Sequence, residues 1–434
     1  MGRNQIATIG LALLLSVPGV GLAQLASPSA RSFGLAGSYS ARARGYEAPY
    51  WNPANLGLPD GAGWSIGIVG ANASLTNNSL SYGQITDLYG EFLDNATKSQ
   101  LLEDIRQGDP DRMFELGAEV GASALAISIW RFGFGLSAVG RGNFKVTPDA
   151  AELILFGNVG ADGTGKDFDV AGNGDGSIFS SAYLSYAQPF TIPALDYLGM
   201  KFSVGASVKY GIAHALIQVN DRGSSFAADP LVLDADVEVL TSNGSNAGQV
   251  WSIDLGAAMD WASWTFGLAL QNAFADVKWN EDDFELTSFV GTADLQSATL
   301  VDTTIAFADL AQEDRDRVVA SLKDADPPKR LRLGAMYRAG PNWSLSADYV
   351  ELIGGSLREQ WDRSLSAGAQ LNLISALPLR AGLATDFSQV ALAGGIGIYA
   401  GAVHLDFSLE TMTLAAGDGL IAALSVSVWP GMNY

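Results

Sequence analysis

The residues of this 434-residue chain that could do chemistry are few. His404, Asp406 and Glu410 share the polar face of 402–411, whose other face is apolar. A histidine beside carboxylates can carry a proton near neutral pH. The pattern favours a polar cluster inside the fold, with a proton-linked or catalytic role as the alternative. Neither His404 nor His214 has a serine or cysteine partner in a recognisable nucleophile motif, so we expect no enzyme.

An acidic, glycine-rich stretch is the second candidate site. Asp167, Asp169, Asn173 and Asp175 alternate with other residues, and calcium prefers such hard oxygen ligands. No glutamate follows at the spacing of a bidentate calcium ligand. We therefore interpret the stretch as an acidic turn loop and keep calcium as the weaker alternative. No other metal and no cofactor is expected.

Period-two alternation of apolar and polar residues dominates the chain from residue 61 onward. It predicts strands with one apolar and one polar face. No internal run reaches the roughly 18 apolar residues of a membrane-spanning helix. A membrane protein without such helices must be a closed β-barrel. We predict about fourteen strands, an even number, at 62–75, 120–130, 132–146, 177–189, 198–218, 248–260, 263–278, 329–339, 342–353, 361–373, 378–387, 390–400, 402–411 and 419–430.

Long and short connections alternate through the first eight connections between the predicted strands. The long ones are 76–119, 147–176, 219–247 and 279–328. An antiparallel up-and-down membrane barrel has short periplasmic turns and long extracellular loops. These four loops hold 32 of the 46 acidic residues but 8 of the 25 basic ones, so the acidity is concentrated at one end. A net charge of -21 argues against nucleic acid as a partner.

Two of the long loops are predicted to carry helical insertions. Asn95 is expected to cap a helix that Gly108 ends. In 307–326, four apolar residues share one helix face. These four are Leu310, Val318, Val319 and Leu322. We expect this stripe to pack on the barrel rim; the alternative is a part in a ligand site above the lumen.

The N-terminus has the form of a targeting segment. Arg3 precedes an apolar run at 6–20, and a small-x-small cleavage pattern follows. We predict a signal peptide at 1–23; the alternative is a buried N-terminal helix. A segment at 24–60 and a transmembrane barrel at 61–434 complete the predicted organisation. The chain has no cysteine, so disulfides play no part in its stability.

The segment just after the signal peptide is rich in glycine and alanine and ends in Trp-Asn-Pro-Ala-Asn-Leu. Its composition, position and final motif resemble the FadL-like fatty-acid and hydrocarbon transporters, in which a short N-terminal hatch plugs a barrel of fourteen strands. The matching residues are Gly37, Gly45, Ala48, Trp51, Asn52, Pro53 and Ala54. Residues 78–105 look like an uncharacterised subgroup of such barrels, known as a domain of unknown function. The secretion-associated PorV shares the hatch motif.

The resemblance implies an all-β protein of the outer membrane of a Gram-negative-type bacterium, with outer-membrane lipid and the barrel-assembly machinery as partners. It implies passive uptake of a small hydrophobic molecule past the hatch. The acidic loops repel carboxylates, so we expect a neutral compound. The alternative function is a non-transporting, PorV-like carrier or structural partner of another protein, with the acidic extracellular loops as the candidate contact.

Overall fold

The computed structural model describes residues 27–59, 61, 63–81, 83–84, 93–109, 111–244, 246–294, 297, 299–324, 327–354, 361–413 and 417–430. The predicted signal peptide at 1–23 lies outside these residues. None of the described helices is long and apolar enough to cross a membrane.

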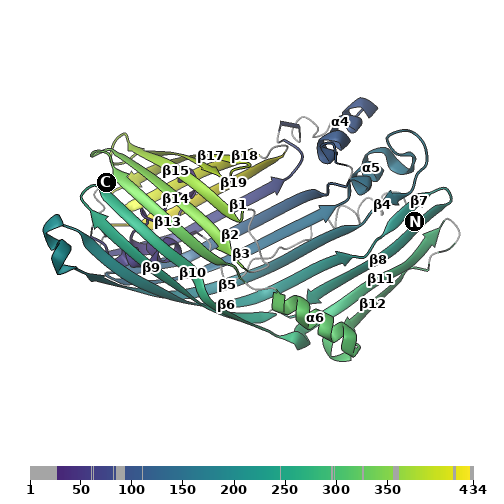
Figure 1. Ribbon diagram of the computed structural model, residues 1–434, viewed down its shortest axis with the longest axis horizontal. Coiled ribbons are helices and arrows are strands. Elements are labelled where there is room, and N and C mark those ends of the chain that lie inside the picture. Colours follow the sequence, from purple (N-terminus) through teal and green to yellow (C-terminus); the bar gives the residue numbers. More distant parts are fainter. Residues whose placement is uncertain are drawn as a thin grey trace.

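Fourteen antiparallel strands form a closed barrel, as predicted (Figure 1). Strands β1 and β19 close it, from Ile66 opposite Val428 to Thr76 opposite Gly419. In order around the wall, the strands are β1 (Trp64–Asn77), β2 (Phe114–Ile129), β3 (Phe132–Val146), β5 (Gly172–Phe190), β6 (Lys201–Asp221), β9 (Gly248–Trp261), β10 (Trp264–Trp279), β13 (Lys329–Arg338), β14 (Trp343–Ile353), β15 (Arg363–Asn372), β16 (Pro378–Thr385), β17 (Val390–Ala400), β18 (Val403–Thr413) and β19 (Asp418–Val428).

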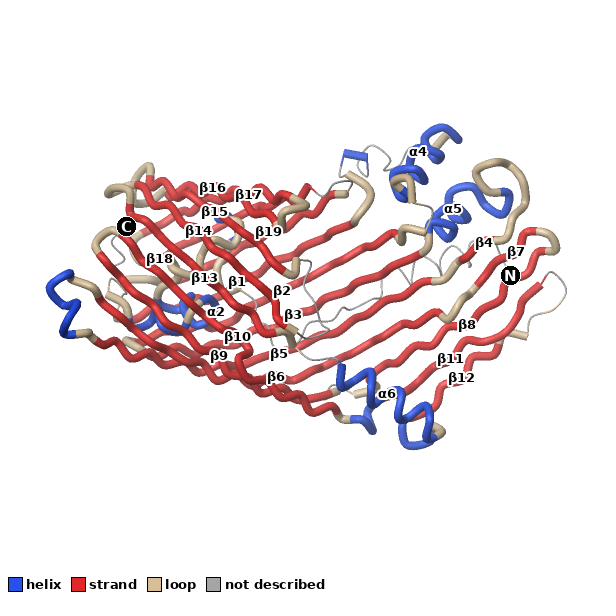
Figure 2. The backbone as a smooth tube through the Cα atoms, in the orientation of Figure 1, coloured by secondary structure: helices blue, strands red, loops and turns tan. Residues whose placement is uncertain are grey.

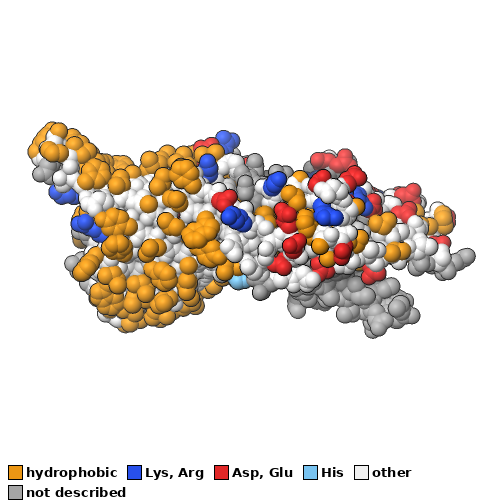
Figure 3. Space-filling view, turned by 90° about the horizontal axis from the view of Figure 1, so that it is seen from below, with side chains coloured by type: hydrophobic (Ala, Val, Ile, Leu, Met, Phe, Trp, Pro, Cys, Tyr) orange, Lys and Arg blue, Asp and Glu red, His pale blue; other side chains and the backbone are white. Residues whose placement is uncertain are grey.

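The alternation of side chains along each strand separates an apolar exterior from a polar interior. On β18, Val403, Leu405 and Phe407 are exposed on the outer face, whereas His404 and Asp406 are buried. Successive strand residues point to opposite faces, so one strand supplies both surfaces. Exposed large apolar side chains occur on strands all around the wall and form an apolar belt. On the face seen in Figure 3, orange apolar side chains cover one half, and red acidic side chains gather at the other end. This is the surface of a barrel embedded in lipid.

The wall is taller on one side than the sequence predicts. The loops expected at 147–176, 219–247 and 279–328 contain five further strands, namely β4 (Phe168–Asp169), β7 (Ser225–Ala228), β8 (Leu231–Ser242), β11 (Phe284–Asp294) and β12 (Val301–Ala306). Strand β6 pairs with β9 from Lys201 to Ala213 and with β8 from Ile217 to Asp221. The prediction of loops over these stretches was wrong where the five strands lie. The alternation is present in β8 from Leu233 to Val239, but its polar face is acidic, and the stretch was therefore interpreted as part of an acidic loop. Strands β7 and β12 are short and do not alternate clearly.

Helices are confined to the connections and the N-terminal region (Figure 2). Helix α4 (Asn95–Arg106) was predicted, but its cap is Asp94, whose carboxylate accepts the Thr97 N–H at 2.8 Å. Helix α5 (Pro148–Phe156) was not predicted. The described 3-10 helices are η1 (Phe33–Leu35), η2 (Gly45–Glu47), η3 (Pro53–Gly57), η4 (Gly157–Val159), η5 (Pro193–Leu198), η6 (Glu281–Asp283) and η7 (Phe307–Asp309).

Helix α6 (Gln312–Asp324) covers the raised part of the wall. Its Val318 and Leu322 pack with Leu310 into one apolar core that also contains Phe179 of β5 and Phe284 of β11. The expected packing of this stripe on the rim is therefore confirmed. The helix is shorter than predicted, because η7 and an extended residue precede it.

Candidate functional site: the N-terminal segment inside the barrel

Residues 27–58, here called the N-terminal segment, lie inside the barrel. The segment has four short helical pieces, η1, η2, α2 (Ala48–Trp51) and η3, joined by turns. Piece η1 contacts β15 to β18, η2 contacts β1 to β3, and η3 contacts β5, β6, β9 and β10. The segment also approaches β13 closely and donates backbone N–H groups to side chains on β14 and β19. The segment therefore contacts all fourteen strands of the wall.

Wall glycines allow the backbone of the segment to approach closely. A Cβ atom on Gly205 of β6 would lie 2.6 Å from the Pro53 carbonyl carbon and the Ala54 nitrogen. One on Gly334 of β13 would lie 2.9 Å from the Ala41 nitrogen. In contrast, a Cβ on Gly394 of β17 would meet nothing within 4 Å. Glycine at the first two positions makes room for another backbone, as it does wherever two chains approach closely.

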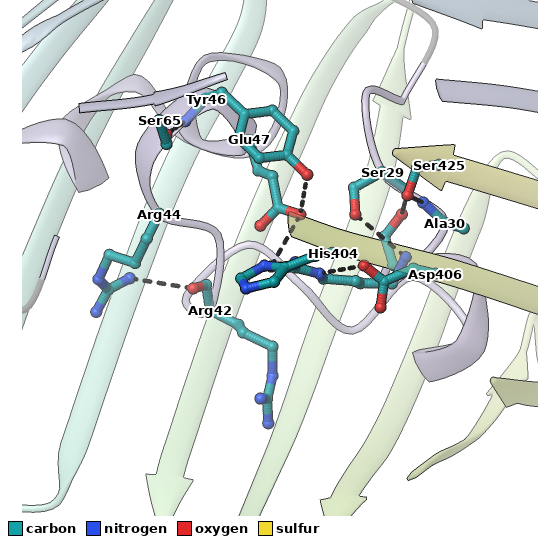
Figure 4. A network of polar contacts seen from close by, with 12 residues as sticks. Ser29, Ala30, Arg42, Arg44, Tyr46, Glu47, Ser65, His404, Asp406 and Ser425 are labelled. Atoms are coloured by element: carbon teal, nitrogen blue, oxygen red, sulfur yellow. Dashed lines mark hydrogen bonds and ion pairs between the residues drawn. The ribbon is translucent and has the colours of Figure 1, made fainter. Parts of the chain in front are cut away.

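A buried charge network ties the segment to β16, β17 and β18. Figure 4 shows His404 and Asp406 of β18 close to Glu47 of the segment. Arg31 Nε donates to Asp406 Oδ2 at 2.8 Å, and its Nη2 donates to His404 Nδ1 at 2.9 Å. Arg380 Nη1 donates to Asp406 Oδ1 at 2.8 Å. Arginine has no acceptor, so His404 receives this bond on an unprotonated nitrogen. Two guanidinium groups therefore share one carboxylate that has no access to water.

Glu47, in the N-terminal segment, is the second carboxylate of this network. Tyr39 donates to Glu47 Oε2 at 2.8 Å, Tyr46 donates to Oε1 at 3.3 Å, and Arg31 Nη1 lies 3.7 Å from Oε1. Arg31 thus links a carboxylate of its own segment to one on the wall. Sequence reasoning did not identify Arg31, Glu47 or Arg380. A signal was present, because charged residues in a glycine- and alanine-rich segment inside a barrel require buried partners.

The structure brings together part of the predicted polar cluster. His404 and Asp406 belong to the network, and the Tyr399 hydroxyl donates to Asp406 Oδ1 at 3.0 Å. Glu410 is also buried on the inner face of β18, but its register partners are Ala393 and Ile421. None of the hydrogen bonds recorded for the described residues joins it to His404 or Asp406. Of the three predicted residues, His404 and Asp406 therefore share one network, and Arg31 of the segment joins them.

The Trp-Asn-Pro-Ala motif contacts the opposite side of the barrel. Asn52 adopts the extended conformation expected before a proline, and its Oδ1 accepts the Ala54 N–H at 3.0 Å. Its Nδ2 donates to the Ala257 carbonyl of β9 at 3.0 Å. Pro53 is the first residue of η3, where its missing N–H costs nothing. Asn52 therefore both shapes the motif and attaches it to the wall.

The other matched residues have distinct surroundings. Trp51 lies under the Arg332 guanidinium, 4.5 Å from its ring centroid. Gly45 has φ +53°, and a Cβ there would lie 2.9 Å from the Trp429 ring. Ala48 is fully buried against Leu56. Gly37 has φ +76° with open space around it, so glycine is favoured there by the backbone conformation and not by lack of space.

The calcium candidates are divided between two strands and a turn. Asp167 is exposed, Asp169 is in β4 and accepts the Ala171 N–H, and Asn173 and Asp175 lie on β5. Asn173 accepts the Asp221 N–H at 3.3 Å. Among the described residues, no three histidine, aspartate or glutamate side chains are grouped as a metal site.

The second histidine has a serine neighbour that the sequence did not indicate. The Ser180 hydroxyl lies 2.7 Å from His214 Nε2, and both side chains are half-buried. A hydroxyl–imidazole pair is only one component of a serine nucleophile site, which also needs an orienting group and an oxyanion hole.

A second ion-pair group connects two extracellular connections. Glu152 of α5 accepts from Arg106 of α4 at 2.6 Å and from Lys166 at 2.8 Å. Burial raises the pKa of Glu152, but hydrogen bonds from the Ala161 N–H, Lys166 and Arg106 outweigh it and hold the pKa below its ordinary value. Burial lowers the pKa of Lys166, but hydrogen bonds to Glu152 and Asp149 outweigh this and raise it. This group fastens α4 to α5 above the barrel.

Solved structures similar to this chain are outer-membrane barrels of the FadL type. The toluene transporter TbuX of Ralstonia pickettii is 14% identical, with 96% of this chain and 99% of that chain covered and a TM-score of 0.48. The toluene transporter TodX of Pseudomonas putida is 13% identical, with 94% and 99% covered and a TM-score of 0.49. A FadL homologue of Pseudomonas aeruginosa is 12% identical, with 95% and 99% covered and a TM-score of 0.47.

No family model matches the sequence, and no curated protein matches it. Identities and TM-scores this low do not assign a function to the chain. The closed barrel and its apolar belt define the class: an integral protein of the outer membrane of a Gram-negative-type bacterium.

Proposed function

We propose that this protein is a channel for the passive uptake of small, neutral hydrophobic compounds, and that the N-terminal segment is the hatch that closes it. The observation that carries the proposal is the contact of one short segment with all fourteen strands. The open lumen of a fourteen-stranded barrel would leak polar solutes, so a channel for hydrophobic compounds needs such a closure.

The way the segment is held supports a movable closure. No backbone-to-backbone hydrogen bond joins the described part of the segment to the wall. Its bonds to the wall pass through side chains, such as Ser38 to Ser346 and Asn52 to Ala257. The segment can therefore rearrange without breaking the ladder that closes the barrel. A strand inserted into the wall would not have this freedom.

Charge supports a neutral substrate. The acidic residues gather at the extracellular end of the molecule, where a solute first arrives. Their field lowers the local concentration of anions and leaves neutral molecules unaffected.

A disulfide lock tests the hatch. The chain has no native cysteine, and the Ser38 and Ser346 hydroxyls lie 3.0 Å apart, so Ser38→Cys with Ser346→Cys should join the segment to β14. The control is Ser185→Cys with Ser207→Cys, which joins β5 to β6 only. Uptake of the neutral hydrophobic dye N-phenyl-1-naphthylamine is measured in cells with intact lipopolysaccharide. Oxidation should abolish uptake through the first variant, reductant should restore it, and the control should transport under both conditions.

A glycine pair gives an independent readout. Gly205→Ala places a methyl group against the segment backbone, whereas Gly394→Ala places one in open space. We expect Gly205→Ala to raise ion conductance in planar bilayers and Gly394→Ala to leave it unchanged. If the locked variant transports normally and Gly205→Ala does not leak, the segment is not a hatch. If no variant and no native protein takes up the dye, the uptake function itself is wrong.

One observation favours a second candidate function, that of a PorV-like carrier or structural partner. The strands β8, β11 and β12 form a sheet that rises above the barrel, and β12 is exposed along its whole length. Such a surface is available to another protein. Purification of the protein in stoichiometric complex with a surface protein, together with an absence of dye uptake, would favour this function.

A further inference from the structure

One periplasmic connection differs from the other short ones. The connections between β2 and β3, β9 and β10, and β17 and β18 have two residues each. The connection between β5 and β6 spans ten residues, 191–200, and contains η5. Its sequence, TIPALDYLGM, has one charged residue, Asp196. This connection, here called the 191–200 turn, is the loop that projects at the left edge of Figure 1.

The turn presents apolar side chains outward. Tyr197 is 82% exposed, Leu198 39% and Ile192 37%. Pro193 and Ala194 are exposed as well. Within the described residues of the turn, only Leu195 and Met200 are half-buried, so η5 has no core of its own. An exposed apolar surface of this kind marks a contact with a protein or a membrane.

The apolar surface of the turn is continuous with the lipid-facing belt. At its base, Phe190 of β5 and Phe202 of β6 are register partners, and their rings stack with centroids 5.7 Å apart. Further along β5, the exposed ring of Tyr186 faces the exposed ring of Phe132 on β3. Their ring centroids lie 5.0 Å apart. Figure 3 shows an orange projection next to the orange area, with blue cationic side chains at its base. Lys201, the first residue of β6, is exposed at this end of the turn.

This continuity identifies the occupant. Apolar side chains that adjoin the lipid-facing Phe190, with a lysine at their base, fit the boundary between acyl chains and phospholipid headgroups, where cationic side chains meet the headgroups. Tyrosine, with an apolar ring and a polar hydroxyl, is enriched at the membrane interface. Exposed apolar side chains of an element that lies on the membrane surface are buried at the boundary of headgroups and acyl chains. We propose that the 191–200 turn inserts into the interfacial region of the inner leaflet and anchors the barrel to its phospholipids.

Site-directed spin labelling tests the anchor, because the native chain contains no cysteine to compete for the label. A nitroxide is attached at Tyr197→Cys, with two controls: Leu405→Cys on the lipid-facing side of β18, and Asp282→Cys at an exposed extracellular position. The full chain is reconstituted in vesicles of phosphatidylethanolamine and phosphatidylglycerol. The relative accessibility of each label to oxygen and to a soluble nickel chelate reports its depth.

We expect the ratio of oxygen to nickel accessibility at 197 to shift from the Asp282 value toward the Leu405 value. A ratio equal to that at Asp282 would place the turn in water and overturn the proposal. Shielding from both reagents in native membranes, combined with an aqueous ratio in vesicles, would indicate a protein partner and also overturn it. The readout needs no transport, so it is independent of the uptake function.

Discussion

At the residue scale, the most demanding position is Asp406. Its two oxygens accept from Arg31 and Arg380, and all three side chains are buried. Ions removed from water are stable only when each charge is paired and hydrogen-bonded. Here one carboxylate joins the N-terminal segment to the wall, while Glu47 balances the second guanidinium charge from the segment side. The network therefore fixes the position of the segment in the closed barrel, through side-chain contacts alone.

Neutralising Asp406 should be strongly destabilising. Asp406→Asn leaves two buried guanidinium groups without an anion between them, and we expect a loss of about 3–5 kcal/mol in the free energy of unfolding. The control is Glu115→Gln, which removes a half-exposed partner of Lys145 and should cost about 1 kcal/mol or less. Urea unfolding followed by tryptophan fluorescence gives both values. Equal losses in the two variants would mean that Asp406 does not hold the segment.

At the element scale, an ion-pair group joins the extracellular helices α4 and α5. Arg106 pairs with Glu152 at 2.6 Å and with Asp149 at 3.3 Å, and Glu152 is the more buried of these two carboxylates. Helix α4 has Leu101, Leu102 and Ile105 on its buried face, and Arg106 at its end reaches Glu152 of α5. Two cations meet at Glu152, so its ionised form is favoured in the folded protein. A group whose folded pKa is lowered stabilises the fold above its unfolded pKa, and this contribution is lost as the pH falls through the folded value.

Acid should therefore loosen α4 from α5. Below the ordinary glutamate pKa of about 4.3, protonation of Glu152 should reduce the free energy that holds α4 against α5 by about 1–3 kcal/mol. A nitroxide at the exposed position Ala96→Cys should become more mobile as the pH falls below this value. Glu152→Gln should make the label mobile already at pH 7. Glu103→Gln, at an exposed position of the same helix, should retain the native pH profile; a changed profile in this control would refute the role of Glu152.

At the scale of the whole molecule, charge is divided along the barrel axis. The membrane belt is apolar, the lumen contains paired charges, and the extracellular end is acidic. Electrostatic repulsion between exposed charges and a solute depends on ionic strength, whereas paired buried charges respond little. The acidic end should therefore act as a salt-sensitive filter on anionic solutes.

Octanoate and octanol form a matched pair for this filter. Raising the salt from about 10 mM to about 150 mM shortens the screening length from about 30 Å to about 8 Å. Channel-dependent octanoate uptake should rise several-fold, and octanol uptake should not change. Both are measured in cells with intact lipopolysaccharide, with cells lacking the protein as background. Equal responses of the two solutes would exclude the acidic end as a filter.

The sequence by itself determined the membrane barrel. Alternation along Val403–Thr413 and its counterparts is a local property, so it identifies the strand and both of its faces without knowledge of its neighbours. The raised sheet of β8, β11 and β12 was missed because its acidic composition was interpreted as that of a loop, although β8 alternates from Leu233 to Val239. The capping residue Asp94 was misplaced by one position, since neighbouring Asp and Asn are both good caps.

Only the tertiary structure decided what surrounds the N-terminal segment. Arg31 and Asp406 are 375 residues apart, and closure of β1 on β19 brings them to 2.8 Å. Gly205 and Gly394 are indistinguishable in the sequence, yet the segment backbone passes beside the first only. Such contacts depend on the register of strands distant along the chain, which no local pattern records. The local alternation of residues therefore specifies a barrel, and the closure of the barrel specifies the partners of the segment inside it.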